Sequence, residues 1–221
     1  MRKGKVKTMD NFIITIARGF GSGGKTIGEE LAKKLGVKCY NKELLELASE
    51  RSGINKEYFF EKDEKVSKKL GKRNTGAYQG VTSSFSDSMF FTEHNLFEYQ
   101  AKTIVNLANT ESCVIIGRAA DFILKNFDNV ISVDIQAPKD VCVIEIMDRY
   151  KISWQEALNS VETTNSNRAE FYRYYTGRIW NDPCNYDLTL NSARVGRDKC
   201  ADVIIDYAER KLGRSIRPEK K

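Results

Sequence analysis

Residues 17–26, which read ARGFGSGGKT, carry glycines, a lysine and a threonine at spacings that bind phosphate. From Gly19 to Thr26 the stretch matches G-x-x-x-x-G-K-[ST], the P-loop. In that motif backbone N–H groups surround a β-phosphate, the lysine charge reaches the β/γ-phosphates, and the threonine hydroxyl binds Mg²⁺. From Gly19 to Gly24 the stretch also matches G-x-G-x-x-G, the dinucleotide fingerprint. The chain therefore carries a phosphate-binding loop that fits two classes of ligand.

The residues around the loop favour the P-loop over the dinucleotide site. A dinucleotide fold has no need for a lysine and a threonine directly after its third glycine. It does need an acid about 20 residues later, and Glu43 lies near that distance, so this alternative stays open. The complete P-loop predicts a nucleoside triphosphate as ligand, with Lys25 catalytic and Thr26 a metal ligand. The predicted ATP-binding residues are Gly19, Gly21, Ser22, Gly23, Gly24, Lys25 and Thr26.

Arginines in the second half of the chain indicate what is done with the phosphate. Phosphoryl transfer needs cations around the transferred group and a lid that keeps water away from it. Arg149 ends one expected helix, and Arg168 and Arg173 lie in the next. One face of that helix passes from apolar anchoring residues to Asn165, Arg168 and Tyr172. This pattern favours a phosphoryl-transfer lid, with a solvated basic helix as the alternative.

Apolar runs alternate with helix-forming runs, and the alternation predicts how these residues are positioned. The expected strands are 12–17, 37–40, 113–117, 130–135 and 186–190. The expected helices are 25–35, 42–53, 92–109, 138–150, one starting at 154 with a Ser-x-x-Glu capping box, and 197–213. Together they predict a three-layer α/β P-loop fold with a five-stranded, doubly wound parallel sheet.

The chain is expected to form a single domain with one segment of different composition. Residues 55–91 are polar and rich in charge, Gly and Ser, so we expect a mobile inserted lobe that binds the acceptor. The other expected parts are a core of 12–54 and 92–212, a helical lid of 149–180, and basic tails of 1–9 and 213–221.

Composition argues against several other classes of protein. Lys and Arg exceed Asp and Glu by 36 − 30 = 6, but no aromatic-interleaved basic motif accompanies the excess, so no nucleic-acid partner is expected. No stretch approaches the roughly 20 apolar residues that span a bilayer, so no membrane contact is expected. The five cysteines show no C-x-x-C spacing, which predicts a reducing, cytoplasmic compartment. The single histidine, His94, argues against a Ser-His-Asp triad and a multi-histidine metal site.

Three blocks of the sequence resemble the cytidylate-kinase-like family, which belongs among the P-loop nucleoside monophosphate kinases. They read ITIARGFGSGGKTIGEELAKKLGVKCYNKELLELA, CVIIGRAADFIL and NRAEFYRYYTGRIWNDPCNYDLTLNS, and the resemblance covers about residues 12–212. It implies ATP with Mg²⁺ as the donor and Arg118 as the arginine that holds the acceptor's phosphate. It also implies that Arg149, Arg168 and Arg173 are lid arginines that close on the transferred group.

Some residues depart from the family's pattern. An acid often stands where this chain has Asn41, and another where Asn165 precedes Arg168. A third tends to follow the phosphate-holding arginine, where this chain has Ala119. Asp121 is then the candidate outer-shell Mg²⁺ partner, although the helix dipole also favours an acid in a first turn. The predicted acceptor-binding residues are Arg118, Asn41, Asn165, Arg168 and Tyr172, and the predicted metal ligands are Thr26 and Asp121.

These features lead us to expect ATP-dependent phosphoryl transfer to a nucleoside monophosphate of the CMP or dCMP type. Two alternatives stay open: a small-metabolite kinase on the same scaffold, and a regulatory module that binds ATP without turning it over. Asn41 and Asn165 keep the last alternative open, because an amide keeps the shape of an acid but loses its charge. The segment NSARVG, residues 191–196, stands where such kinases pass backbone around the donor base, although its composition is that of a plain loop.

Overall fold

The computed structural model describes residues 11–52 and 87–218 and contains one five-stranded sheet. Its strand order is β2-β3-β1-β4-β5, and every pairing in it is parallel. The strands are β1 (Ile13–Arg18), β2 (Lys38–Tyr40), β3 (Cys113–Ile116), β4 (Val130–Gln136) and β5 (Leu188–Asn191). The predicted fold class, an α/β fold with a five-stranded parallel sheet, is confirmed.

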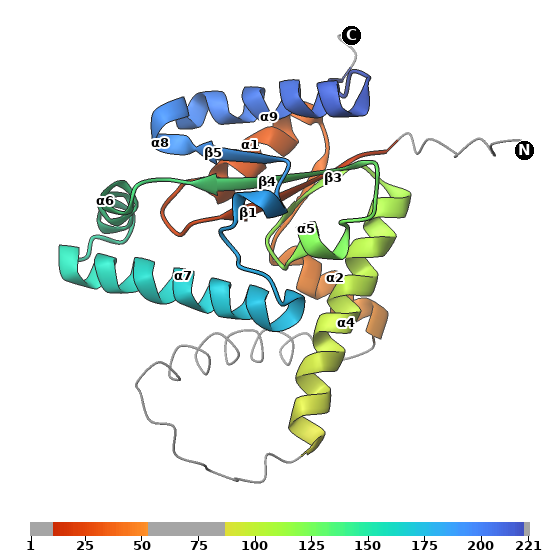
Figure 1. The fold of residues 1–221 in the computed structure, drawn as a ribbon, viewed down its shortest axis with the longest axis horizontal. Helices are drawn as coiled ribbons and strands as arrows, with labels where there is room; N and C mark the ends of the chain where they lie inside the picture. Colours follow the sequence, from red (N-terminus) through yellow and green to blue (C-terminus); the bar gives the residue numbers. More distant parts are fainter. Residues whose placement is uncertain (1–10, 53–86, 219–221) are drawn as a thin grey trace, which may run out of the picture.

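Helices follow the strands in the predicted alternation (Figure 1). They are α1 (Gly24–Leu35), α2 (Glu43–Ser52), α4 (Asp87–Thr110), α5 (Ala120–Ile123), α6 (Lys139–Tyr150), α7 (Trp154–Thr176), α8 (Ser192–Val195) and α9 (Arg197–Leu212), with a 3₁₀ turn at Pro183–Asn185. A helix around Asp121 was expected without bounds and corresponds to α5, whereas α8 and the 3₁₀ turn were not predicted, because segments this short carry no periodic apolar pattern. In the described part of the chain, no helix is long and apolar enough to cross a bilayer.

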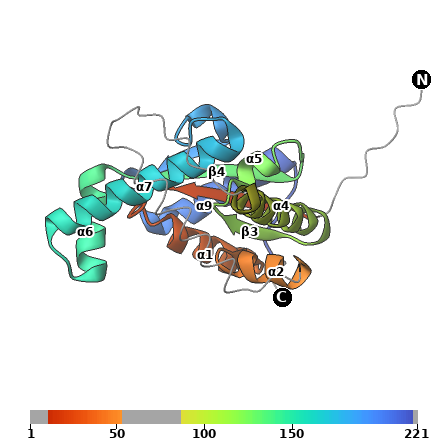
Figure 2. The ribbon, with the colours of Figure 1, turned by 90° about the horizontal axis from the view of Figure 1, so that it is seen from below.

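The helices cover both faces of the sheet, as the alternation of side chains along the strands requires. Ile14 and Ile16 of β1 pack with α1 and α9, whereas Ile13 packs with residues of α2, α4 and α5 on the other face. Figures 1 and 2 show the sheet between these two layers, with α9 and α7 on opposite sides of it. Because the strands are buried on both faces, they appear as nearly continuous apolar runs in the sequence.

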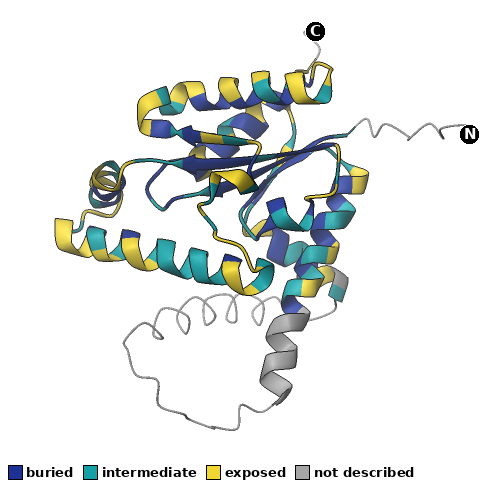
Figure 3. Cartoon of the chain, in the orientation of Figure 1, coloured by how far each residue is buried: buried dark blue, intermediate teal, exposed yellow. Residues whose placement is uncertain are grey.

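Helix α6 follows β4 at the carboxyl edge of the sheet, and α7 packs against it. The predicted capping box starts α7, where the Ser153 side chain accepts from the backbone N–H of Glu156 and the Glu156 carboxylate accepts from that of Ser153. Cys142, Val143 and Ile146 of α6 pack against α7, and Phe20 of the P-loop packs against the same cluster. In Figure 3, exposed residues lie along the faces of α7 and α9 that point away from the sheet.

The structure describes only part of two predicted segments, the inserted lobe and the C-terminal tail. The expected lobe, 55–91, lies outside the described residues except at its end, where α4 already begins at Asp87. The expected tail from 213 onwards is packed over its described part, to residue 218. Ile216 is buried in the core, and Arg217 bonds Glu209 and Asp206 of α9. An apolar residue beside complementary charges holds this segment against the helix.

Candidate active site

The P-loop connects β1 to α1 in a conformation that needs its glycines. Gly21 and Gly23 have φ of 86° and 82°, in the left-handed region that side chains disfavour. A Cβ at Gly21 would also lie 2.6 Å from the backbone oxygen of Cys142 on α6. The loop therefore turns tightly at the start of α1, where N–H groups and the helix dipole favour an anion.

Residues far along the chain hold the P-loop in place. Asn165 of α7 accepts a hydrogen bond from the backbone N–H of Phe20 at 2.8 Å through its Oδ1. The buried hydroxyl of Ser192 on α8 donates to the backbone oxygen of Ser22 at 2.6 Å. Asn165, predicted to contact the acceptor, thus contacts the P-loop, and the NSARVG segment forms α8 beside the same loop.

Lys25 and Thr26, the two chemically active residues of the motif, begin α1 with exposed side chains. The Lys25 ammonium lies 3.5 Å from Glu29 one turn further along, and the Lys25 side chain is 58% exposed. An exposed i,i+4 pair of this kind contributes only about 0.5 kcal/mol. Lys25 is therefore free of core packing and can turn towards a bound phosphate.

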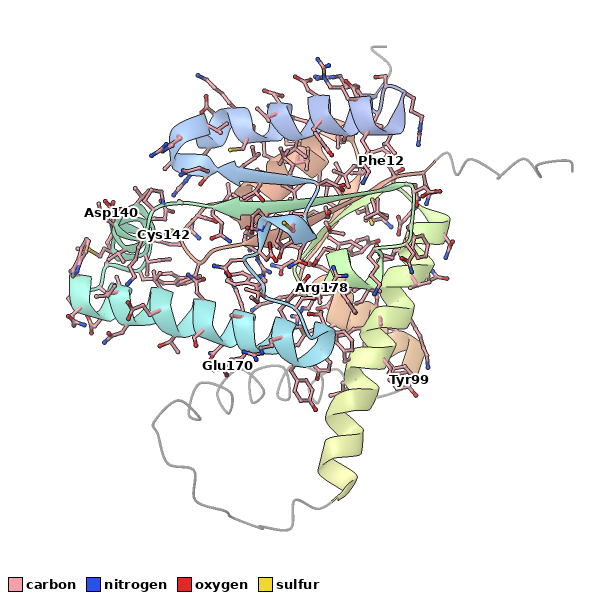
Figure 4. All side chains as sticks on the ribbon, in the orientation of Figure 1. Phe12, Tyr99, Asp140, Cys142, Glu170 and Arg178 are labelled. Carbon is pink, nitrogen blue, oxygen red and sulfur yellow. The ribbon has the colours of Figure 1, made fainter. Side chains whose placement is uncertain are left out.

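A cavity of about 340 Å³ lies beside the P-loop, where the carboxyl ends of β1 and β3 meet α7. Its α7 residues are spaced i, i+3, i+4, i+7 and i+8, which places them on one face of the helix. Figure 4 shows side chains filling the space between α7 and the sheet. The lining residues are Ala17, Arg18, Gly117, Arg118, Ala119, Asp121, Thr164, Asn167, Arg168, Phe171, Tyr172 and Trp180.

Three arginines from three elements line this cavity: Arg18 ends β1, Arg118 follows β3, and Arg168 lies on α7. The Arg168 guanidinium donates to the backbone oxygen of Arg18 at 2.8 Å and lies 5.7 Å from the ring of Phe20. Close packing around the Arg168 guanidinium lowers its pKa to about 10, so it stays charged at neutral pH. The cavity wall therefore concentrates positive charge where an α/β fold binds ligands.

The turn after β3 has an unusual backbone. Gly117, Arg118 and Ala119 all have positive φ, of 74°, 63° and 52°. A non-glycine residue in this region costs roughly 1–2 kcal/mol, and such strain concentrates at functional sites. A Cβ at Gly117 would lie 2.0 Å from the Arg18 guanidinium, so the glycine makes room for that side chain. The strained turn thus brings Arg118 and Arg18 to one end of the cavity.

Asp121, predicted to contact Mg²⁺, and Tyr172, predicted to contact the acceptor, form a hydrogen bond with each other. The Tyr172 hydroxyl donates to Asp121 Oδ2 at 2.6 Å, and both residues are buried. Burial raises the pKa of the Asp121 carboxyl, although the Tyr172 hydrogen bond opposes the shift. Asp121 stands at the cavity wall, but one of its oxygens is already occupied.

The remaining predicted residues lie outside the cavity lining. Asn41 follows β2, and its backbone N–H donates to Glu43 at 3.0 Å at the start of α2. Arg173 lies exposed in the last turn of α7. Arg149 donates to Glu145 at 2.7 Å in the last turn of α6.

Glu145 connects Arg149 to the P-loop through a second arginine. Its other oxygen accepts from Arg197 at 2.6 Å, and Arg197 also donates to the backbone oxygen of Gly21 at 3.2 Å. Partial burial raises the pKa of the Glu145 carboxyl, but hydrogen bonds from Arg197 and Arg149 outweigh it and lower the pKa below its ordinary value. This ionised carboxylate holds Arg149 on α6 in the present arrangement.

The cavity lining includes residues that the sequence did not indicate, among them Arg18, Asn167, Phe171 and Trp180. Arg18 sits inside the P-loop stretch, where the motif pattern directs attention to the glycines. Asn167 falls one helical turn beyond Thr164 on the face of Arg168, so the helical spacing could have found it. Trp180 follows α7 in an irregular segment, where no periodicity predicts orientation.

Comparison with known proteins identifies the scaffold that carries this site. The cytidylate kinase-like family matches residues 13–194. The chain belongs to the cytidylate kinase-like family. No curated protein matches the chain. The family and the P-loop fold support the assignment of the chain as an ATP-dependent phosphotransferase.

Several solved structures are similar to this chain over most of its length. The crystal structure of an uncharacterized protein from Eubacterium ventriosum ATCC 27560 is 27% identical, covers 90% of this chain and 99% of its own, and has a TM-score of 0.66. A shikimate kinase from Bacteroides thetaiotaomicron is 14% identical, with 91% and 98% covered and a TM-score of 0.48. A shikimate kinase from Acinetobacter baumannii, in complex with shikimate, is 15% identical, with 90% and 95% covered and a TM-score of 0.44. The two shikimate kinases are too distant to argue for an acceptor.

Kinases generally use ATP with Mg²⁺, and two side chains of this cytidylate kinase-like protein, those of Thr26 and Asp121, are candidates to contact the metal. Mg²⁺ keeps several waters and binds through one or two protein groups plus substrate phosphates. The exposed hydroxyl of Thr26 at the start of α1 fits this role. Asp121 fits only through water or its second oxygen, since Tyr172 occupies Oδ2. Within residues 11–52 and 87–218, no group of three acidic, histidine or cysteine side chains forms a cation site of its own.

A further buried carboxylate lies on β4 beside this region and gives a stability prediction. Asp134 pairs in register with Ala17 of β1, is almost completely buried, and accepts from Gln136 at 2.9 and 3.2 Å. Burial raises its pKa from 3.8 to about 6. The folded protein therefore keeps this proton up to a higher pH than the unfolded chain does, so stability falls as pH rises from about 4 to about 6.

Asp134→Asn is expected to stabilise the protein at pH 8 by at most about 3 kcal/mol, because it removes a buried charge and keeps the shape. The gain should vanish at about pH 2.5, which is below both pKa values, because the carboxyl is then protonated in both states. Urea unfolding at the two pH values measures both effects. Asp187→Asn is the control of opposite sign: burial raises the Asp187 pKa, but Lys211 and Ser132 outweigh it and lower the pKa. An equal gain from Asp134→Asn at both pH values would contradict the explanation.

Proposed function

We propose that this protein transfers the γ-phosphoryl group of ATP to a nucleoside monophosphate of the CMP or dCMP type. The observation that carries the proposal is the cavity beside the P-loop, lined by Arg18, Arg118 and Arg168. One carboxylate, Asp121, lines the same cavity, and it is bonded to a tyrosine. A phosphate group is the ligand that such an arginine cluster recognises best, because guanidinium groups match its geometry and charge.

The expected chemistry follows from this arrangement. The P-loop and Lys25 hold the β- and γ-phosphates of ATP, and Arg118 with Arg18 holds the phosphate of the acceptor. An acceptor phosphate oxygen attacks the γ-phosphorus, the bond to the β–γ bridging oxygen breaks, and the products are ADP and the acceptor diphosphate. Thr26 would hold Mg²⁺ together with the ATP phosphates, and the metal would supply positive charge beside the transferred group. Positioning and charge account for the catalysis, so no residue has to act as a covalent nucleophile.

One contact keeps a small-metabolite kinase on the same scaffold as the second candidate. Asn165, expected to contact the acceptor, is engaged with the backbone N–H of Phe20 instead. Asn41 likewise lies outside the cavity lining. The acceptor would then be recognised by a set of residues different from the expected one.

A panel of acceptors tests the proposal directly. The purified chain is incubated with ATP, Mg²⁺ and one candidate at a time, and ADP release is measured. The panel contains CMP, dCMP, UMP and AMP, together with two metabolites that carry no nucleobase, ribose 5-phosphate and shikimate. Acceptor-dependent ADP release with CMP or dCMP is expected. ADP release only with a metabolite that carries no nucleobase would favour the second candidate, and no release with any acceptor would favour a regulatory ATP-binding module.

Arg118→Ala is expected to raise the KM of the acceptor at least about tenfold while changing the KM of ATP much less. Removing a charge-assisted hydrogen bond to a phosphate costs about 1.5–3 kcal/mol. Initial rates at varied acceptor and varied ATP separate the two constants. Arg210→Ala, an exposed arginine in the last turn of α9, serves as the matched control. Equal changes in both KM values would remove Arg118 from the acceptor's phosphate site.

A further inference from the structure

Asn167 has an unsatisfied polar atom at the wall of the cavity. The residue lines the cavity from α7, one position before Arg168. Its Oδ1 is buried and has no hydrogen-bond partner anywhere in residues 11–52 and 87–218. Buried polar atoms in native proteins are satisfied in the large majority, so each exception needs an explanation. A ligand that supplies the missing donor is such an explanation here.

The unpaired oxygen makes this position well suited to bind a donor group. The protein has already lost the hydration of Oδ1 in folding, so a ligand that donates to it breaks no existing protein hydrogen bond. Rotation about χ2, which is a soft torsion in asparagine, turns the oxygen towards the cavity without leaving a partner behind. An incoming N–H or O–H group therefore gains a bond at little cost to the protein.

Aromatic side chains beside Asn167 indicate the shape of the group that carries the donor. Phe171 and Trp180 line the same cavity. Phe171 is held by Tyr175 and Phe97, with ring centroids 4.8 and 6.1 Å away, and Tyr175 stacks on Phe97 at 3.9 Å. This cluster fixes the Phe171 ring between α7 and α4. A fixed aromatic wall favours a planar ring over a flexible polyol, because ring faces stack.

We propose that Asn167 selects the acceptor, by accepting a hydrogen bond from an N–H group on a planar heterocycle. The arginines bind the acceptor's phosphate, while Asn167, Phe171 and Trp180 recognise the ring. The inference rests on the proposed function, in that it places the acceptor in this cavity. It narrows the acceptor to a phosphate-bearing molecule that contains an amino-substituted heterocycle, such as an aminopyrimidine nucleotide.

Binding of three probes to the full chain tests the proposal by calorimetry. The probes are CMP, the same nucleotide with its 4-amino group replaced by hydrogen, and ribose 5-phosphate. Each is titrated into the unmodified protein, into Asn167→Leu, and into Asn159→Leu. Asn159 is a matched control, because it is exposed on the same helix and outside the cavity lining.

The unmodified protein and Asn159→Leu are expected to bind CMP about tenfold or more tightly than the nucleotide that has hydrogen in place of the amino group. Asn167→Leu should bind those two nucleotides equally and should bind ribose 5-phosphate as the unmodified protein does. A merely structural role for Asn167 would weaken all three probes together and leave the CMP preference intact, which would overturn the proposal. No CMP binding by the unmodified protein, or no preference for the amino group, would overturn it too.

Turnover assays separate this inference from the proposed function. One outcome is that Asn167→Leu removes the preference for the amino group while no acceptor causes ADP release. That outcome would support ring recognition and contradict the proposed kinase activity. ADP release with an acceptor that carries no nucleobase, together with no amino-dependent binding, would support a kinase and contradict recognition of a heterocycle.

Discussion

Lys25→Ala is expected to abolish phosphoryl transfer while leaving the fold intact. Lys25 completes the P-loop at the start of α1, and its counterpart in such loops reaches the β/γ-phosphates as charge develops on them. Its side chain is 58% exposed, and among the residues that the structure describes its ion-pair partner is the exposed Glu29, so its removal costs little stability. We therefore expect an unchanged melting temperature, weaker ATP binding and no measurable ADP release above background.

The matched control is Lys33→Ala. Lys33 is an exposed lysine in the last turn of the same helix, at the end opposite the P-loop. It reports what the loss of one surface lysine from α1 does to stability and to net charge. Near-normal turnover by a folded Lys25→Ala variant would contradict the P-loop assignment, since no other lysine of α1 lies at the loop.

The elements of this fold could be predicted because their signals are local. The apolar run ending in the P-loop, the repeat of Ile27, Leu31 and Leu35, and the capping box before α7 each lie within a few residues of sequence. Burial on both sheet faces then makes a strand and its neighbours apolar throughout. These signals gave the sheet, the long helices and the loop at its carboxyl edge.

The contacts that shape the site join residues far apart in the sequence, and no local pattern predicts them. Asp121 and Tyr172 are 51 positions apart, and each looks like an independent candidate until the fold brings them within 2.6 Å. Asn165 and Phe20 are 145 positions apart, so the family pattern suggested an acceptor contact where the structure has a P-loop contact. The sequence thus indicated which side chains gather around the loop, but not which of them bond to one another.

Arg168→Ala is expected to lower kcat by about 10³ or more and to change ATP affinity much less. The guanidinium lies between the arginine-lined cavity and the P-loop, held by its hydrogen bond to the Arg18 carbonyl and by the Phe20 ring. Burial of the guanidinium lowers its pKa to about 10. A charge in such surroundings acts strongly on charge that develops on a transferred phosphoryl group. Arginines that stabilise this transition state contribute 10³–10⁵ in kcat.

Three variants separate this effect from its alternatives. Arg168→Lys keeps a positive charge but loses the planar fork, so it should recover part of kcat and not all of it. Arg210→Ala, from the exposed end of α9, should leave kcat and both KM values as they are. If Arg168 acted only as a support for the P-loop, Arg168→Ala would raise the KM of ATP and lower the melting temperature while kcat stayed near normal. A regulatory ATP-binding module would show no turnover in the unmodified protein, and there Arg168→Ala would act on ATP affinity or on nothing. A large loss in kcat with ATP affinity preserved is therefore the result that places Arg168 on the transferred group.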